Sequence, residues 1–315
     1  MNLLAVVFVI LKNIIFGSSI LFTSYLTDHV DIADILAIRF LLSFALMWLL
    51  KTFKVLRIDV GVKDLFVKNE RTPYLKTVVA AVIFEPVLCL ALETLGISMT
   101  NGITTAVIIA LYPMMNCLTE ITVLKEKTTL AEKVLLAVGI VGVIYISVKS
   151  GASGGKNSVI GILFLFASVF SGSLYQVLTR KTSKQFSSME MTYFYTMFGA
   201  VAFNAFNIVR RISLGTLSSY FAPLSDKQNL IGFLFLSVMG SVVGMIMVNY
   251  AFAKMQVTTV AAFGGIATLT TILLGVIFRN ESVYYYHIIG LTLVFIRMFG
   301  VYYIAKKREK DSARI

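Results

Sequence analysis

Long apolar runs, separated by short polar breaks, occupy most of the chain. A helix needs about 20 mainly apolar residues to cross roughly 30 Å of hydrocarbon, and the runs have about that length. Each run is therefore predicted to be a membrane-spanning helix, which makes the fold an all-α integral membrane protein. The ten predicted transmembrane helices cover residues 3–26, 33–50, 75–94, 102–123, 130–148, 159–179, 190–209, 229–253, 257–278 and 283–304.

The composition excludes a soluble globular protein. Of the 315 residues, 58% are hydrophobic and 14% are charged, against averages of about 45–50% and about 25% in soluble domains. One water-facing fold cannot bury so much apolar surface, so lipid must solvate much of it. The first run starts at Asn2 with no basic segment before it and no small-residue cleavage site after it. We therefore expect a retained helix rather than a signal peptide.

The net charge of +12 is explained by the loops rather than by a nucleic-acid surface. Nineteen Lys and Arg residues lie in loops on the same side as the N-terminus, and six lie on the other side. Because cytoplasmic loops collect basic residues, the asymmetry predicts that both termini are cytoplasmic, in a plasma (inner) membrane. The stretch from Lys51 to Lys76 is then a topology signal, and residues 306–315 form a basic cytoplasmic tail with weak attraction to lipid headgroups. The six basic residues on the far side are Lys149, Lys156, Arg210, Arg211, Lys227 and Arg279, and the first far-side loop carries Asp28, Asp31 and Asp34.

The second half of the chain repeats the first at a spacing of 155 residues. The spacing pairs Gly17 with Gly172, Thr27 with Thr182, Ala45 with Ala200, Thr104 with Thr259, Ala106 with Ala261 and Glu126 with Glu281. Each repeat holds five predicted helices, an odd number, so the second copy must enter the bilayer from the opposite side. Such inverted repeats are a frequent plan of secondary transporters, with a site at the bilayer midplane. The sequence therefore predicts a five-helix repeat over 1–149, a Gly- and Ser-rich joint over 150–157 and a second, inverted repeat over 158–305.

Several short segments share the pattern of a known module. They are Phe16-Gly17-Ser18 and Arg39-Phe40 in the first two helices, Leu111-Tyr112-Pro113 and Lys125-Glu126 around the fourth, and Gly139 and Gly142 in the fifth. In these segments the chain resembles the EamA-type module of the drug/metabolite transporter superfamily, and the resemblance covers almost the whole chain as two modules. It implies ten helices, an inverted five-plus-five repeat, a central cavity lined by both halves, and carriage of small metabolites without nucleotide hydrolysis. In the second module Thr268 replaces Pro113 and Arg297 replaces Gly142, so the proline expected to kink the fourth helix has no counterpart in the ninth.

Six charged residues within the predicted helices are candidates for a role inside the membrane, and none of the six has a charged counterpart 155 residues away. They are Lys12, Arg39, Glu85, Glu93, Glu120 and Arg297. An Arg, Lys or Asp costs roughly 2.5–3.5 kcal/mol at the centre of a membrane helix, so we expect each charge to have a partner or to face water. By depth, Arg39 matches Glu93 and Glu120 matches Arg297, and we interpret these as structural ion pairs. Lys12 and Glu85 both lie near the midplane, where a ligand-binding role and a structural role are equally open.

Polar side chains near these charges complete the candidate site. Pro86 is expected to kink the third helix beside Glu85, and a buried carboxylate there could exchange protons. Thr105, Tyr112, Asn116 and Glu120 share one face of the fourth helix, and Ser168, Ser171 and Tyr175, with Gln176 beside them, share a face of the sixth. Hydrogen bonding between helices is the alternative explanation of the face on the fourth helix, and close packing of small residues is the alternative explanation of the face on the sixth. The predicted substrate-binding residues are Lys12, Glu85, Tyr112, Asn116, Tyr175 and Gln176, and the predicted coupling or gating residues are Glu85 and Glu120.

These features favour a secondary transporter, an exporter or exchanger, of a small polar or amphipathic metabolite such as an amino acid or amine. We expect Lys12 to hold a substrate carboxylate and Glu85 to hold an amine or a proton, with the small molecule and membrane lipid as the partners. The alternatives are a polytopic membrane enzyme, which would need acids and histidines clustered at one membrane face, and a non-transporting scaffold or sensor. We expect no enzyme activity, no cofactor and no metal, because His29 and His287 lie far apart and no phosphate-loop motif occurs. Proton coupling and a homodimer are both open, and Glu126 and Glu281 are interpreted as capping or anchoring the loops that follow two helices.

Overall fold

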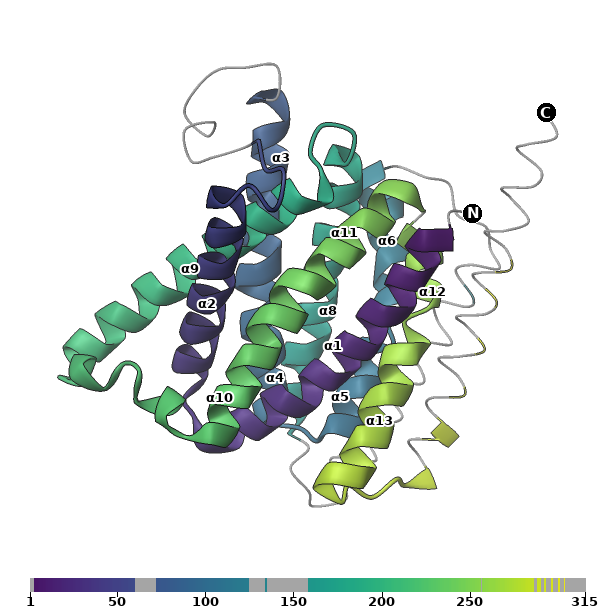
Figure 1. Ribbon diagram of the computed structural model, residues 1–315. Coiled ribbons are helices and arrows are strands. Elements are labelled where there is room, and N and C mark those ends of the chain that lie inside the picture. Colours follow the sequence, from purple (N-terminus) through teal and green to yellow (C-terminus); the bar gives the residue numbers. More distant parts are fainter. Residues whose placement is uncertain are drawn as a thin grey trace, which may run out of the picture.

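The computed structural model is built from helices, and the residues that it describes contain no strand. It describes residues 3–59, 72–124, 134, 158–255 and 257–285, with the single positions 288, 289, 292, 296, 300 and 303. The helices form a bundle in which α2 packs against α9 and α1 packs against α13, at opposite sides of the view in Figure 1. The all-α architecture agrees with the apolar runs in the sequence.

Within the described part of the chain, six helices are long and apolar enough to cross a membrane. The seventh and ninth predicted helices also coincide with helices, α9 (Ser188–Ser213) and α13 (Gly265–Arg279). The predicted joint over 150–157, the predicted tail over 306–315, the predicted fifth helix apart from Val134, and most of the predicted tenth helix lie outside the described residues. The six apolar helices are α1 (Leu3–His29), α2 (Ile32–Thr52), Pro73–Ser98, Gly102–Glu120, α8 (Val159–Thr182) and Lys227–Lys254.

Short polar side chains determine where several helices begin. The Asp31 carboxylate accepts the backbone N–H of Ala33 at 2.9 Å and caps α2. The Ser187 hydroxyl accepts the N–H of Glu190 at 3.2 Å, and the Glu190 carboxylate accepts the N–H of Ser187 at 2.8 Å, which forms a capping box at the start of α9. These caps satisfy backbone donors that the first turn of a helix leaves free, so they stop the helices at the edge of the apolar runs.

The third and eighth predicted helices each depart from regular α-helix near their middle: the third is broken at Glu85, and the eighth passes through π-helical turns. Glu85 has an extended backbone (φ −144°, ψ 120°), and the following Pro86 has no N–H to donate, so the helix breaks where the sequence predicts a kink. The hydroxyl of Ser171 donates to the carbonyl of Phe84 at 2.8 Å, which satisfies a backbone acceptor at the break. The eighth predicted helix has π-type turns at the same place in the repeat, and Gly240 stands where the first repeat has Glu85. The segments are α3 (Thr72–Val82), η2 (Ile83–Leu88) and α4 (Cys89–Ser98) in the third, and α10 (Lys227–Leu234), η5 (Phe235–Gly244) and α11 (Met245–Lys254) in the eighth.

The fourth and ninth predicted helices are also divided at matching positions. Pro113 lies in the first turn of the second segment of the fourth helix, where a proline fits because that turn has free N–H groups. The ninth helix breaks without a proline, because Gly264 and Gly265 occupy the junction and Thr268 lies one turn further on. The break therefore recurs although the proline does not. The segments are α5 (Gly102–Ile109) and α6 (Tyr112–Leu124) in the fourth helix, and α12 (Val257–Ala262) and α13 in the ninth.

Equivalent helices of the two halves make equivalent contacts. The contact of α4 with α8 corresponds to that of α11 with α1, and the contact of α6 with α8 corresponds to that of α13 with α1. Gly17 and Gly172 lie at two of these crossings: a Cβ on Gly17 would be 2.5 Å from the Ala267 carbonyl oxygen, and one on Gly172 would overlap the Tyr112 hydroxyl. Thr271 adds a hydrogen bond of 3.0 Å to the carbonyl of Gly17. Glycines at these positions allow the close approach that membrane helices use in place of hydrophobic burial.

Candidate functional site

A cavity of about 130 Å³ lies between the helices and is lined by both halves of the chain. Its walls come from α1, α2, η2, α4, α5 and α6 in the first half and from α8, α9, η5, α11, α12 and α13 in the second. The break at Glu85 and the π-helical stretch at Gly240 both reach it, and so do the junctions at Ala110 and Gly264. A buried water needs about 10–15 Å³, so the cavity has room for several waters or for part of a small ligand.

Of the residues that the structure describes, four with charged side chains line this cavity: Lys12, Arg39, Glu85 and Glu93. Their formal charges cancel. Among the described residues, no nitrogen of Lys12 or Arg39 lies within 4.0 Å of a carboxylate oxygen of Glu85 or Glu93. Two positive and two negative groups therefore share one enclosed space without forming a contact ion pair.

Arg39 is held by a serine instead of by the acid that depth matching suggested. Its Nε donates to the hydroxyl of Ser241 at 2.8 Å, and its guanidinium lies 5.8 Å from the centre of the Phe40 ring. The predicted ion pair with Glu93 is therefore absent as a direct contact, although Glu93 lines the same cavity. Depth gives the height of a residue in the membrane, but the rotation of its helix decides which neighbour it meets.

Lys12 and Glu85, the two midplane charges, both line the cavity. The Lys12 ammonium lies 5.2 Å from the centre of the Phe16 ring, a cation–π distance. Glu85 sits at the break in the third helix, where the extended backbone directs it away from the regular helix face. Neither residue has a hydrogen bond or an ion pair to another described side chain.

The remaining predicted site residues divide between the cavity wall and the layer behind it. Tyr112, Tyr175 and Gln176 line the cavity. Asn116 is fully buried and donates from Nδ2 to the side-chain oxygen of Gln176 at 3.0 Å, so it supports the wall from outside. Glu120 is buried away from the cavity, and Arg297, its predicted partner, lies outside the described residues.

The structure adds cavity residues that the sequence interpretation omitted. Ser19 and Thr23 line the cavity from α1. Together with Lys12 and Phe16 they occupy one helix face at spacings of four, three and four, a pattern that the sequence could have revealed. Gly240 also lines the cavity and could have been found as the repeat counterpart of Glu85.

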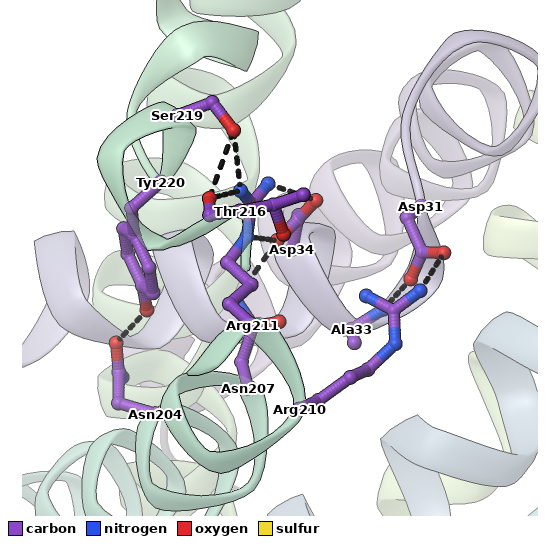
Figure 2. Close-up of polar contacts among 10 residues, drawn as sticks. All are labelled: Asp31, Ala33, Asp34, Asn204, Asn207, Arg210, Arg211, Thr216, Ser219 and Tyr220. Carbon is purple, nitrogen blue, oxygen red and sulfur yellow. Dashed lines mark hydrogen bonds and ion pairs between the residues drawn. The ribbon is translucent and has the colours of Figure 1, made fainter. Parts of the chain in front are cut away.

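A second group of charges lies where α1, α2, α9 and α13 end or begin, and we call it the end cluster: Asp28, Asp31, Asp34, Arg210, Arg211, Arg279 and Glu281. Figure 2 shows its central part, in which the guanidinium of Arg211 makes two hydrogen bonds to Asp34, from Nε at 2.8 Å and from Nη2 at 2.7 Å. Asn207 donates to the same carboxylate at 2.8 Å. Arg210 contacts Asp31 at 2.6 Å. The acids of the first predicted far-side loop are thus bound to arginines of the second half.

The loop that follows α9 is attached to this cluster. Arg211 Nη1 donates to the carbonyl of Thr216 at 2.8 Å and to the hydroxyl of Ser219 at 3.0 Å (Figure 2). The Tyr220 hydroxyl donates to the side-chain oxygen of Asn204. Burial raises the pKa of Tyr220, so the phenol stays protonated and can donate. The loop is therefore fixed to α9.

Glu281 connects the ninth helix to the fourth. Its two carboxylate oxygens accept the backbone N–H groups of Gly102 and Ile103, each at 3.0 Å, at the start of α5. Arg279, two residues earlier, pairs with Asp28 at 2.6 Å. Glu281 therefore caps the start of α5 rather than the loop that follows its own helix, and its predicted counterpart Glu126 lies outside the described residues.

Nearly the whole chain is similar to known transporter sequences. The family model of the EamA-like transporter family matches it twice, over residues 3–148 and 159–303. A protein of Bacillus subtilis (strain 168), named Uncharacterized transporter YcxC, is 27% identical over 301 residues, which cover 96% of this chain and 93% of that protein. A protein solved as a crystal structure aligns with a TM-score of 0.63 at 16% identity, over 96% of this chain and 97% of that chain, and this likeness concerns the fold alone.

Proposed function

Because this chain belongs to the EamA-like transporter family and is an integral membrane transporter, we propose that it carries a small polar or amphipathic metabolite by alternating access. In this proposal it is a secondary transporter, an exporter or exchanger, and its substrate is an amino acid or amine. The substrate occupies the central cavity, where Lys12 and Arg39 present positive charge and Glu85 and Glu93 present negative charge.

One observation carries this proposal: four charges line one cavity without pairing with one another. A charge inside a membrane protein costs several kcal/mol unless a partner or water compensates it. A structural pair would gain most by direct contact, as Asp34 and Arg211 do at 2.7 Å. Charges kept apart around a space remain available to a polar ligand.

Alternating access is supported by the similarity of the two halves. We propose ten helices arranged as two inverted five-helix repeats, 1–149 and 158–305. The family model matches twice, and both the π-helical segments that contain Glu85 and Gly240 and the junctions before Tyr112 and Gly265 recur at a spacing of about 155 residues. Two halves with the same fold can pack against each other in two nearly equivalent ways, one open to each side of the membrane.

We propose that both termini lie in the cytoplasm and that the membrane is the plasma (inner) membrane. The count of nineteen basic loop residues against six supports this orientation. Of the six basic residues on the far side, Arg210, Arg211 and Arg279 each pair with an aspartate. Their charge is therefore balanced and does not oppose this orientation. Cysteine labelling at Ser153 from outside intact cells, with Ser183 as the inward-facing control, tests the orientation. Labelling at Ser183 but not at Ser153 would reverse it.

The function itself is tested by uptake into proteoliposomes that contain the purified chain. We would screen labelled amino acids, amines and drugs, with and without a pH gradient, and repeat each positive assay as counterflow from preloaded vesicles. Saturable uptake of one class, accelerated by internal substrate, supports the proposal, and a response to the pH gradient assigns proton coupling. If the full panel gives no flux above empty vesicles, the chain acts as a scaffold or sensor instead.

A further inference from the structure

Arg39 has the geometry of an anion-binding residue. Its side chain is largely buried, with the residue 6% exposed, yet it lines the cavity. Only Nε is engaged, by Ser241 at 2.8 Å, and neither Nη nitrogen has a hydrogen-bond partner among the described residues. A guanidinium that is fixed through Nε can present its two Nη groups together to a planar carboxylate.

Gly240 lies directly beside the Arg39 guanidinium, and the lack of a side chain at this position leaves the Nη groups uncovered on that side. A Cβ built on Gly240 would lie 3.4 Å from Arg39 Nη2 and 3.2 Å from the Ser19 hydroxyl. In the first repeat the equivalent position holds Glu85, so the second repeat lacks the carboxylate at the place that the arginine faces. The arginine therefore faces a position where an acid is missing from the protein and could be supplied by a ligand.

Arg39 and Phe40 are adjacent in α2 but have different roles. Phe40 is fully buried, and its ring contacts those of Tyr195 and Phe203 at centroid distances of 5.5 and 5.3 Å. It fixes α2 in the bundle and leaves the neighbouring guanidinium at the cavity wall. Lys12 is the other cation, but its ammonium lies over the Phe16 ring and has no hydrogen bond that orients it.

We propose that Arg39, oriented by Ser241 and opposite Gly240, binds the carboxylate of a small zwitterionic substrate. The inference rests on the proposed transport function and assigns the carboxylate to Arg39 rather than to Lys12. Glu85 and Glu93 line the same cavity and would receive the ammonium group of that substrate.

The charge balance of the cavity favours a zwitterion over an anion or a simple amine. The formal charges of the four described charged residues at the cavity sum to zero. A zwitterion therefore leaves the loaded site neutral while it compensates one base and one acid. A dianion such as a phosphate would face two carboxylates in the same space, and an amine would leave Arg39 without a partner. Desolvated charge without compensation is costly, so both alternatives bind less well.

The anion site can be tested without knowledge of the substrate, by thermal unfolding of the purified full chain in detergent. Gly240→Asp supplies a protein carboxylate beside Arg39, and Gly240→Ala is the matched control that adds the same Cβ, with the same close contacts to Ser19 and Arg39, but without charge. We expect the aspartate variant to melt several degrees above the alanine variant, because its carboxylate pairs with Arg39. An aspartate variant that melts below the alanine variant overturns the anion site.

The dependence on Arg39 is tested by repeating both substitutions in an Arg39→Gln background. The advantage of aspartate over alanine should disappear there, because the added acid has lost its partner. If Arg39→Gln does not fold, Arg39→Lys replaces it, and we then expect a smaller advantage because the fork of two Nη groups is lost. An advantage of equal size in either background would show that Arg39 is not the partner.

The substrate class is tested in proteoliposomes with matched compounds: phenylalanine, 2-phenylethylamine and 3-phenylpropionate, and then leucine, isopentylamine and 4-methylpentanoate. We expect uptake of the zwitterion in at least one set, at least tenfold lower uptake of the two analogues, and loss of uptake in Gly240→Asp. Equal uptake of the amine overturns the zwitterion assignment but leaves the transport function intact. Absence of uptake of all six compounds, together with a failed general screen, counts against the transport function, while the melting comparison still decides the anion site.

Discussion

The end cluster and the cavity contain the same kinds of charged residues, but they hold them in opposite ways. In the end cluster, Arg211 donates two hydrogen bonds of 2.7 and 2.8 Å to Asp34, and Asn207 donates a third to the same carboxylate. In the cavity, Lys12 and Glu85 line one space with no contact ion pair to each other or to the other cavity charges.

This difference separates charges that stabilise the fold from charges that remain available. A buried pair in direct contact has compensated its desolvation within the protein, so removal of one partner leaves an uncompensated charge. Charges around a cavity depend on water or on a ligand for the same compensation. Variants in the end cluster should therefore change stability, and variants in the cavity should change transport.

The largest effect on stability is expected at Asp34. The two side chains of the Asp34–Arg211 pair are only 6% and 9% exposed, and breaking a buried pair costs about 3–5 kcal/mol. Asp34→Ala should therefore lower the melting temperature of the purified protein strongly. The double variant Asp34→Leu with Arg211→Met removes both charges and should recover part of the loss. If Asp34→Ala melts like the unaltered protein, the contrast between the two regions fails.

The cavity should show the opposite pattern when Lys12 and Glu85 are removed together. Lys12→Met with Glu85→Leu deletes one base and one acid, so the double variant should fold with a melting temperature close to that of the unaltered protein. Loss of one charge-assisted contact to substrate, worth about 1.5–3 kcal/mol, should lower uptake about 10- to 100-fold.

Single cavity variants serve as controls for that experiment. Glu85→Gln removes the acid alone. Because Lys12 and Glu85 make no contact ion pair, this variant should lower transport with a smaller loss of melting temperature than Asp34→Ala. A folded double variant with normal flux and unchanged pH dependence would show that Lys12 and Glu85 have no part in transport.

Much of the fold could be predicted from sequence, because lipid imposes a length on every helix that crosses it. The first predicted helix, 3–26, corresponds to Leu3–His29. Pro86 also predicts the break at Glu85, because proline has no backbone N–H to donate. The break before Gly265 was not anticipated, because glycines in a membrane helix are equally consistent with close packing.

The candidate site could be predicted in part, because sequence reveals polar residues within apolar runs but not the rotation of the helices that carry them. Polar residues such as Lys12 and Tyr112 stand out within apolar runs, and the structure places both on the cavity. Gly240 contributes by the absence of a side chain, which no search for polar residues detects. The partner of Arg39 was missed as well, because sequence gives depth along the helix but not the rotation that brings Ser241 within 2.8 Å.

A smaller effect is expected at Glu281, which belongs to the end cluster but binds backbone. Its carboxylate accepts two N–H groups at the start of α5, and loss of such a cap costs about 0.5–2 kcal/mol. Glu281→Ala should lower the melting temperature moderately, and Glu281→Gln, which keeps one acceptor oxygen, should lower it less. Equal losses in the two variants would indicate that the negative charge, rather than the acceptor, stabilises the helix start.

The smallest effect is expected at the exposed edge of the end cluster, the pair of Asp28 and Arg279. The two side chains are 26% and 24% exposed, about three times as much as those of Asp34 and Arg211, although the pair is as short, at 2.6 Å. Pairs that water and salt can reach contribute about 0–1 kcal/mol, and that contribution falls as ionic strength rises. Asp28→Asn should therefore lower the melting temperature slightly in low salt and not measurably at about 1 M salt, where the screening length is about 3 Å. Asp34→Asn, measured under both conditions, is the matched control and should lose stability in each. If the loss at Asp28 were independent of salt and as large as that at Asp34, the exposure of an ion pair would not determine its contribution to stability in the end cluster. The contact between α1 and α13 would then contribute as much to stability as the contact between α2 and α9.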